Sequence, residues 1–449
     1  MNPNAEATIN KKTNRDGMIP KPSALIDVSN QSLNSLGENL SFFPIAGIAL
    51  IEYQIRTVAE AGIDHVVLWT EDLFSEDNEG NNSALETKAH FNFQLVNVIE
   101  RLRKKAIHLS LIHGRQELSA AFSDNQSVLL IEGDCLPSVH LVETLVRNTA
   151  PTLLTIEDGI SSQEFERIDA SERWGGIALV EGKIIREAKN IPDDWDLILT
   201  IMRQTMQSGC KRMTVKAPVN GNDFIFKITK NKNNAFISKG IYQATENKCN
   251  KNIFYKKIFS KIIDKNIILL TRKRNISLYL LIITFVFIFL SLLFSLTNMP
   301  ILSVLSLILS GLSGYGSHRI NEMQLNTGRK KQRKLIYYSR RMGASLALIC
   351  SSYYISKHVG WGIFPLDIII ILANISAYQD NNYCKKLSLE DSGNHYLYFE
   401  YILWIILPFT LLSKYNVSFV LCGLILLAAL SIVNYGFSTK KLQQGLEKI

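Results

Sequence analysis

Residues 127–137 read SVLLIEGDCLP, and this stretch decides the fold of the N-terminal half of the chain. Its apolar run at 127–131 predicts a buried strand, which ends where Glu132 and Asp134 begin a charged loop. In an open parallel sheet, ligands bind beyond the carboxyl ends of the strands. Mg2+ prefers oxygen ligands, so Asp134 is a candidate metal ligand. The alternative is that Asp134 caps a helix beginning near Pro137, and the residues leave both interpretations open.

Outward from this strand, short apolar runs alternate with helical patterns through residues 20–230. Four further runs are typical of buried strands, and three segments have the apolar spacing of helices. The predicted strands are 23–28, 64–70, 107–113 and 152–156, and the predicted helices are 48–61, 88–105 and 138–148. Strands that alternate with helices indicate a mainly parallel sheet, so we expect one α/β domain here.

The C-terminal half is dominated by long apolar runs. Residues 276–296, ISLYLLIITFVFIFLSLLFSL, contain 21 residues without a charge, which is long enough for a helix to cross a bilayer. Five further candidate spans lie at 300–316, 338–356, 361–378, 397–413 and 417–435. The sequence therefore predicts an all-α transmembrane domain of six helices over residues 276–436.

Basic residues mark one side of this predicted domain, in a chain whose net charge is +9. They cluster at 272–274, 319–334, 385–386 and 440–441, whereas the alternate loops are short and nearly uncharged. Cytoplasmic loops carry the excess of Lys and Arg in membrane proteins. We therefore expect a multi-pass protein of the cytoplasmic (inner) membrane, with both termini in the cytoplasm.

The remaining segments complete the predicted organisation. Residues 1–19 are polar and read as a disordered lead-in without a secretory signal, and residues 437–449 as a cytoplasmic tail. Within a linker at 231–275, Lys251–Asn275 places apolar residues at helical spacing among lysines. This pattern favours an amphipathic helix on an anionic membrane surface over a solvated linker helix. The six cysteines show no metal-binding spacing and indicate free thiols in a reducing compartment.

Two segments of the N-terminal half resemble a known family. Phe42–Thr70 (FFPIAGIALIEYQIRTVAEAGIDHVVLWT) and residues 127–146 (SVLLIEGDCLPSVHLVETLV) are similar to sugar-phosphate and inositol-phosphate nucleotidyltransferases. The resemblance implies a Rossmann-like (GT-A-like) α/β nucleotidyltransferase fold in the cytoplasm, with Mg2+ as cofactor. It implies that Asp134 is at the metal position and that Asp223, in NGNDFIF, is at a second metal position.

The resemblance breaks down at the nucleotide-binding loop. In that family a glycine-rich loop with an arginine and a lysine holds the triphosphate. Residues 27–47, DVSNQSLNSLGENLSFFPIAG, have one glycine before Pro44 and neither arginine nor lysine. The same segment instead offers the acidic residues Asp27 and Glu38. We therefore do not expect ordinary nucleotidyl transfer.

Residues 309–320, LSGLSGYGSHRI, form a predicted glycine-rich turn at the end of the second span. Small residues also let membrane helices pack closely, which is the simpler explanation of this stretch. With six spans, an amphipathic helix and the upstream domain, the chain resembles the bifunctional inositol-1-phosphate cytidylyltransferase/CDP-alcohol phosphotransferase (CDP-alcohol phosphatidyltransferase) family. That family carries the pattern D-G-x2-A-R followed by G-x3-D-x3-D, and its four aspartates bind metal ions.

In this chain the pattern keeps its glycines and loses its acids. The resemblance assigns Gly311 and Gly314 to the binding turn. The residues that stand at the four aspartate positions are Ser310, Ser313, Ile336 and Arg340. Serine is a weak, neutral ligand and arginine repels a cation, so we expect no two-metal centre here.

Two hypotheses for the function follow. The first is a pseudoenzyme of phospholipid or phospho-alcohol synthesis, which acts as a scaffold or partner of an active CDP-alcohol phosphotransferase. The alternative is an active membrane transferase that moves a phospho-alcohol or nucleotidyl group with non-standard residues. The candidates are Asp134 and Asp223 in the cytoplasmic domain, and His318, Arg319 and Arg340 at the membrane face. The expected partners are the lipid bilayer, CTP or a CDP-alcohol, and a second copy of the chain or a phosphotransferase, but no nucleic acid.

Overall fold

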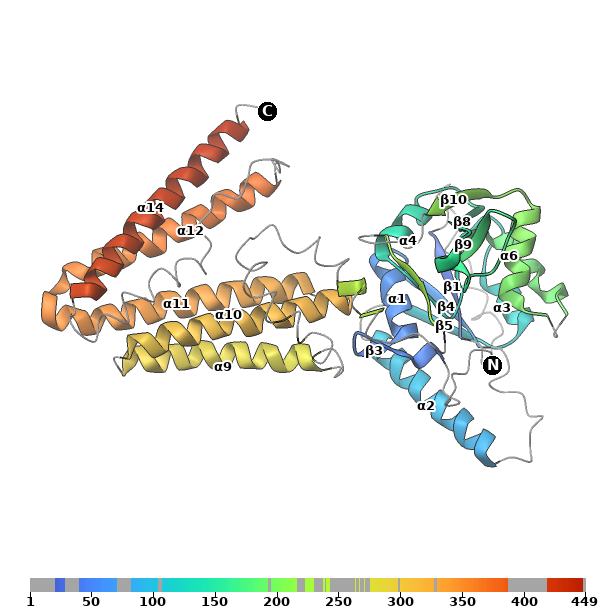
Figure 1. The fold of residues 1–449 in the computed structure, drawn as a ribbon, viewed down its shortest axis with the longest axis horizontal. Coiled ribbons are helices and arrows are strands. Elements are labelled where there is room, and N and C mark those ends of the chain that lie inside the picture. The colour runs from blue at the N-terminus through green and yellow to red at the C-terminus, as the bar shows by residue number, and fades with distance from the viewer. Residues whose placement is uncertain are drawn as a thin grey trace, which may run out of the picture. The chain divides into compact units, whose positions relative to one another are not determined.

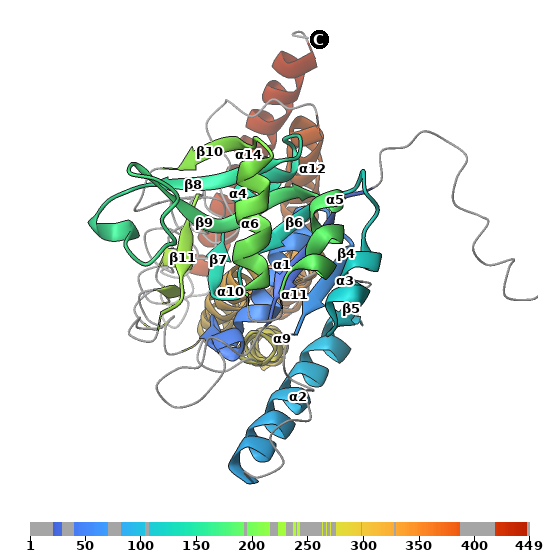
Figure 2. The ribbon, with the colours of Figure 1, turned by 90° about the vertical axis from the view of Figure 1, so that its right-hand side faces the viewer.

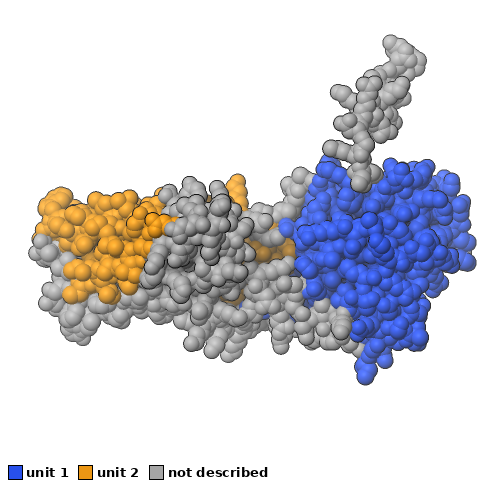
Figure 3. Space-filling model, turned by 90° about the horizontal axis from the view of Figure 1, so that it is seen from above, with its two compact units in different colours: residues 1–247 blue, residues 248–449 orange. Residues whose placement is uncertain are grey.

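The computed structural model describes residues 21–28, 40–70, 82–103, 107–192, 195–215, 223–229, 275–297, 299–326, 329–386 and 418–446, with a few positions between 237 and 270. The chain divides into two compact units, which Figure 3 colours separately. Unit 1 is Met1–Asn247 and unit 2 is Lys248–Ile449. The division falls within the segment 231–275 that the sequence analysis assigns to a linker.

Unit 1 is built on a seven-stranded sheet with the strand order β10-β8-β9-β6-β1-β4-β5 (Figure 2). Its strands are β1 (Ser23–Asp27), β4 (His65–Trp69), β5 (His108–Ile112), β6 (Ser127–Ile131), β8 (Thr152–Glu157), β9 (Glu172–Glu181) and β10 (Lys211–Val215). Strand β9 runs antiparallel to β6 and β8, and the other neighbouring strands are parallel. The predicted α/β domain with a mainly parallel sheet is therefore confirmed.

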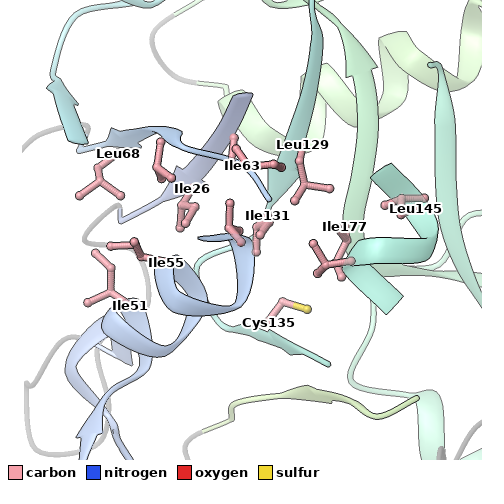
Figure 4. Close-up of a cluster of buried hydrophobic side chains, with 14 of the residues drawn as sticks. Ile26, Ile51, Ile55, Ile63, Leu68, Leu129, Ile131, Cys135, Leu145 and Ile177 are labelled. Carbon is pink, nitrogen blue, oxygen red and sulfur yellow. The ribbon is translucent and has the colours of Figure 1, made fainter. Parts of the chain in front are cut away.

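Helices cover both faces of this sheet. They are α1 (Leu50–Glu60), α2 (Asn82–Arg103), α3 (Arg115–Ala121), α4 (Val139–Val146), α5 (Gly182–Arg186) and α6 (Leu197–Gln207). Successive side chains of a strand point to opposite faces. In β1, Ile26 accordingly packs in the cluster of α1, α2 and α4 (Figure 4), and Leu25 packs in the cluster of α3, α5 and α6. The apolar run of β1 is thus buried on both sides.

Short elements complete unit 1. Strand β7 (Cys135–Pro137) pairs antiparallel with β11 (Ile225–Lys227), and β2 (Pro44–Ile45) pairs antiparallel with β3 (Ile48–Ala49). Single-turn 3-10 helices lie at Leu40–Phe42, Ile160–Ser162 and Glu187–Asn190. These two small sheets are not predictable from sequence periodicity, because their strands are only two or three residues long.

All regular secondary structure in the described residues of unit 2 is helical (Figure 1). Its helices are α9 (Ile276–Leu296), α10 (Pro300–Met323), α11 (Arg329–Val359), α12 (Phe364–Lys386) and α14 (Ser418–Leu446), with a 3-10 turn at Trp361–Ile363. Within the described part, α9 and α10 are long and apolar enough to cross a membrane. The apolar stretches Trp361–Ala373 and Cys422–Val433 are shorter. The predicted span at 397–413 lies outside the described residues, so six spans remain a prediction.

The glycine-rich stretch 309–320 is helical, so the predicted turn is wrong and the alternative of small residues at a close helix contact is correct. All of it belongs to α10, which continues to Met323. Its glycines lie against side chains of the neighbouring helices. A Cβ on Gly314 would be 3.0 Å from Ile336 Cγ2, and a Cβ on Gly316 would be 3.3 Å from Leu280 Cδ1. The glycines therefore serve close helix packing rather than a break in the helix.

Helix α9 buries its polar residues and exposes its apolar ones, which is the reverse of an amphipathic helix in a water-soluble protein. Its buried residues are mostly small and polar, namely Ser277, Thr284, Ile288, Ser291 and Ser295. Two of them form hydrogen bonds with α10. Thr284 Oγ1 lies 3.0 Å from Ser313 Oγ, and Ser291 Oγ lies 3.0 Å from Ser303 Oγ. Its exposed residues are large and apolar, and include Ile282, Phe289 and Leu296. Small polar residues between helices and apolar residues outside are typical of helices in lipid.

Candidate functional site

The candidate site of unit 1 lies where β1 and β6 end. Strand β1 ends at Asp27, and the loop after β6 carries Glu132, Gly133 and Asp134. The two chain segments are so close at Gly133 that an added Cβ would lie 2.5 Å from the carbonyl oxygen of Asp27. Glycine is therefore required at this position, and its absence of a side chain brings the acidic loop beside Asp27.

Helix α1 holds this loop in place through Gln54, whose side chain is buried. The Gln54 amide nitrogen Nε2 lies 3.1 Å from the carbonyl oxygen of Glu132, 3.3 Å from that of Gly133 and 2.7 Å from that of Cys135. Buried carbonyl groups need such donors, since an unpaired one costs about 1–3 kcal/mol. One side chain thus fixes the backbone that presents Glu132 and Asp134.

Strand β11 brings a lysine to the same place. In the β7–β11 pair, Lys227 is opposite Cys135, and the Ile228 amide donates to the carbonyl of Asp134 at 2.8 Å. Lys227 Nζ donates to Glu132 Oε1 at 2.9 Å and lies 3.7 Å from Asp134 Oδ2. The side chain of Lys227 is 13 % exposed. An ammonium group is therefore built into the acidic loop, largely out of contact with water.

The electrostatics of the site follow from this burial. Burial raises the pKa of Asp134 to about 7; Glu132 and Asp27 also raise it, and Lys227 opposes the shift. Burial likewise raises the pKa of Glu132, against the effect of Lys227. Burial lowers the pKa of Lys227, but Asp134 and Glu132 more than offset this effect and raise it overall. Lys227 is thus a permanent cation beside two carboxyl groups that ionise reluctantly.

The structure separates the two residues predicted to bind metal. Asp134 lies at the carboxyl edge of the sheet beside Lys227, whereas Asp223 Oδ1 is hydrogen-bonded to His140 Nδ1 on α4. Both side chains of the latter pair are half-exposed. The metal-ligand role of Asp134 and Asp223 therefore remains a prediction.

The capping role considered for Asp134 is wrong. Helix α4 begins after Ser138, whose Oγ accepts a hydrogen bond from the Leu141 amide at 3.2 Å. Strand β7 separates Asp134 from that helix. The carboxylate of Asp134 is therefore not explained by helix capping.

The residues at this edge do not fit a divalent cation as they stand. Asp134 Oδ1 is buried and accepts no hydrogen bond from the described residues, so one oxygen is available. Among those residues, however, no three His, Cys, Asp or Glu side chains are grouped as a metal site requires. Lys227 already supplies one positive charge at the loop, and a second cation within a few ångströms would be repelled by it.

In unit 2, two of the four positions that the resemblance assigns to metal-binding aspartates, Ser310 and Arg340, are in contact. Arg340 Nε donates to Ser310 Oγ at 3.1 Å, and Arg340 Nη2 donates to the carbonyl of Leu307 at 3.3 Å. The guanidinium lies against Gly311, where a Cβ would be 2.6 Å from Nη2. A buried arginine thus fills the space between α10 and α11 that a glycine leaves open.

The other two predicted membrane-face residues have different surroundings. His318 Nδ1 lies 3.8 Å from Glu322 Oε1, one turn further along α10. Arg319 is fully buried in unit 2. His318, Arg319 and Arg340 are therefore all in or beside α10, but the contacts described for them do not join them into one catalytic arrangement.

Sequence reasoning missed Glu132, Gln54 and Lys227 as site residues. Lys227 reaches the loop only through the pairing of two three-residue strands that are 90 positions apart in the chain. One signal was present, since Lys227 is the only charged residue in the apolar run FIFKI at 224–228. A lone lysine in a buried strand needs a carboxylate partner.

The comparisons with known proteins add a likeness at the level of solved structures. No family model matches the chain, and no curated protein matches it. A Bacillus anthracis protein assigned as a glucose-1-phosphate thymidylyltransferase, solved with sucrose, is 12 % identical with a TM-score of 0.35, and the match covers 49 % of this chain and 94 % of that one. The inositol-1-phosphate CTP transferase of T. maritima is 14 % identical with a TM-score of 0.35, covering 48 % of this chain and 95 % of that one. Both neighbours are nucleotidyltransferases.

Proposed function

We propose that the chain is an integral membrane protein of the fused nucleotidyltransferase and CDP-alcohol phosphotransferase type that has lost phosphotransferase catalysis. In this proposal it acts as a scaffold or partner of an active CDP-alcohol phosphotransferase in phospholipid or phospho-alcohol synthesis. The observation that carries it is the contact of Arg340 with Ser310, at two of the four positions where the resemblance expects metal-binding aspartates.

The chemistry of these positions supports the loss of catalysis. A metal centre that binds a pyrophosphate needs several carboxylates, because their charge must offset the dehydration of the ions. Here a neutral hydroxyl and a buried guanidinium occupy two positions, and Ile336 and Ser313 occupy the others. A fixed positive charge at this place disfavours a divalent cation.

The surface of α9 supports a position in the membrane. Nine large apolar side chains of this helix are more than one-third exposed, whereas its buried face bonds to α10 through hydroxyl groups. A water-soluble protein rarely exposes so large an apolar surface. Lipid is a favourable environment for this apolar surface, and the backbone of a helix makes its hydrogen bonds within the helix.

An activity assay tests this proposal. The full chain is purified in detergent and incubated with radiolabelled CTP or a radiolabelled CDP-alcohol, a phospholipid acceptor and Mg2+ or Mn2+. An intact CDP-alcohol phosphotransferase in the same detergent is the positive control. We expect no product from the wild-type chain, and recovery of an intact phosphotransferase when the tagged chain is isolated from its native membranes.

The variants Asp134→Ala and Arg340→Ala make the assay decisive. Turnover by the wild-type chain that either substitution abolishes would show an active enzyme and overturn the proposal. Failure of the chain to stay in the membrane fraction after an alkaline carbonate wash would overturn its membrane part.

A further inference from the structure

Lys227 of strand β11 contacts both carboxylates of the acidic loop in unit 1, and its charge affects metal binding there. Lys227 Nζ is 2.9 Å from Glu132 Oε1 and 3.7 Å from Asp134 Oδ2, and each of the three side chains is less than one-fifth exposed. Asp27, the last residue of the neighbouring strand β1, places a third carboxylate near Asp134. The ammonium therefore lies among the groups that would otherwise attract a divalent ion.

The position of Lys227 is fixed by the backbone and not by the ion pair alone. Strand β11 is held against β7, and hydrogen bonds on either side of Lys227 join the Ile228 amide to the Asp134 carbonyl and the Ser138 amide to the Phe224 carbonyl. Gln54 holds the opposite partner, the loop, from helix α1. Both the cation and the carboxylates are thus presented by rigid segments.

We propose that Lys227 is the resident cation of this site, and that it replaces a divalent ion and keeps Mg2+ and Mn2+ out. Removal of its charge would leave Glu132 and Asp134 without the ammonium group that contacts both, and Lys227→Asp would place a third carboxylate beside them. Such a group of carboxylates is a divalent-cation site. The inference rests on unit 1 alone and does not depend on the membrane role proposed above.

A metal titration tests this inference without any activity. The full chain in detergent is titrated with Mn2+, and the free ion is counted by electron paramagnetic resonance. The wild-type chain should show no stoichiometric binding in the micromolar range. Lys227→Asp should bind one Mn2+ in that range, and the added change Asp134→Asn should abolish this binding.

Arg212 offers a matched control. Arg212 Nη1 also bridges two carboxylates, at 2.6 Å from Asp169 Oδ2 and 2.9 Å from Glu172 Oε2, but on an exposed part of the sheet. Arg212→Asp makes the same change in charge at a site where water screens it. We expect Lys227→Asp to bind Mn2+ more than about tenfold more tightly than Arg212→Asp does.

The outcomes separate cleanly. Stoichiometric binding by the wild-type chain that Asp134→Asn removes would overturn the inference. So would a Lys227→Asp variant with a wild-type circular dichroism spectrum that binds no more tightly than Arg212→Asp. If Lys227→Asp loses that spectrum, Lys227→Met decides, because it keeps the length of the side chain and removes the charge. It should bind Mn2+ more tightly than the wild-type chain, and equal binding would overturn the inference.

Discussion

Among single residues, Asp134 has the most constrained surroundings in unit 1. Its Oδ1 is buried without a hydrogen bond from the described residues, and Glu132 and Asp27 add negative charge nearby. Burial and these neighbours outweigh Lys227, so the pKa is raised to about 7. In the folded protein Asp134 therefore keeps a proton that an unfolded aspartate releases at about pH 4.

This shift predicts how stability depends on pH. Because the folded-state pKa is raised, stability is lost as the pH rises from about 4 towards 7. Asp134→Asn imitates the protonated form and therefore does not lose stability as the pH rises. In this variant Lys227 still has Glu132 as a partner. We expect the variant to gain on the order of 1–3 kcal/mol over the wild-type chain at pH 8 and little at pH 4.5.

Urea unfolding of the full chain in detergent, followed by tryptophan fluorescence across this pH range, measures the difference. Asp124→Asn is the control, because Asp124 is an exposed carboxylate paired with Arg186. A difference that shrinks as the pH rises would contradict the assignment.

Gly133 provides a second test at this scale. A Cβ there would lie 2.5 Å from the Asp27 carbonyl oxygen, a contact that requires the backbone of β1 or of the loop to move. Gly133→Ala should destabilise unit 1 by about 1–3 kcal/mol, as overpacking does. Gly159→Ala is the control, since its φ of −173° is ordinary extended backbone and its Cβ would be 4.0 Å from the nearest atom. Equal melting temperatures of the two variants would show that the close approach is absent in solution.

At the scale of elements, apolar runs predicted the strands and central helices of unit 1 well. The five predicted strands correspond to β1, β4, β5, β6 and β8. Four of them are buried over nearly their whole length and carry continuous apolar runs, whereas the edge strand β5 is only partly buried. Strand β9 was missed, and its Gly175 and Gly176 interrupt the pattern. Gly176 has a φ of +76° and lies against Cys135, which strand propensities do not encode.

The same reasoning failed at α10 for a related cause. Its glycines and serines resemble a turn when only the local sequence is considered, but in the folded chain they form the contact face toward α9 and α11. The partner that explains Gly311 is Arg340, 29 residues later. The local composition allowed both a turn and a close helix contact, and packing against α9 and α11 decides for the helix contact.

Helix α9 predicts an asymmetric response to a charge. Phe289 is 61 % exposed in the middle of α9, and a lysine there would face hydrocarbon at a cost of about 2.5–3.5 kcal/mol. Phe289→Lys should lower the amount of chain that resists an alkaline carbonate wash of the membranes. Phe93→Lys on α2, where Phe93 is 68 % exposed, should leave that amount unchanged. Equal effects of the two substitutions would argue against a lipid-facing α9.

For the whole molecule, each unit has hydrophobic clusters of its own among the described residues. Both large hydrophobic clusters of unit 1 consist of residues up to Ile225, on the two faces of one sheet. The cluster around Ile370 and Leu427 belongs to unit 2 alone. Unit 1 thus has the buried apolar residues that a domain needs to fold by itself.

A truncation tests this independence. Residues 1–247 alone should be soluble and should unfold cooperatively, at the temperature of the first transition of the full chain in detergent. Circular dichroism at rising temperature measures both, and Gly133→Ala should lower the midpoint by the same amount in each. Aggregation of the fragment, or a midpoint shift seen in only one of the two proteins, would contradict the separation of the cores.

The three hydrogen bonds from Gln54 to backbone carbonyls should also slow the opening of the loop at 132–135. Because one buried amide joins helix α1 to the loop at 132–135, the loop can open only when these hydrogen bonds break. The backbone amides of Glu132, Cys135 and Ile228, which donate around this loop, should therefore exchange with deuterium at one common, slow rate. Gln54→Ala should uncouple them, so that these amides exchange faster while those at the centre of β6 keep their protection.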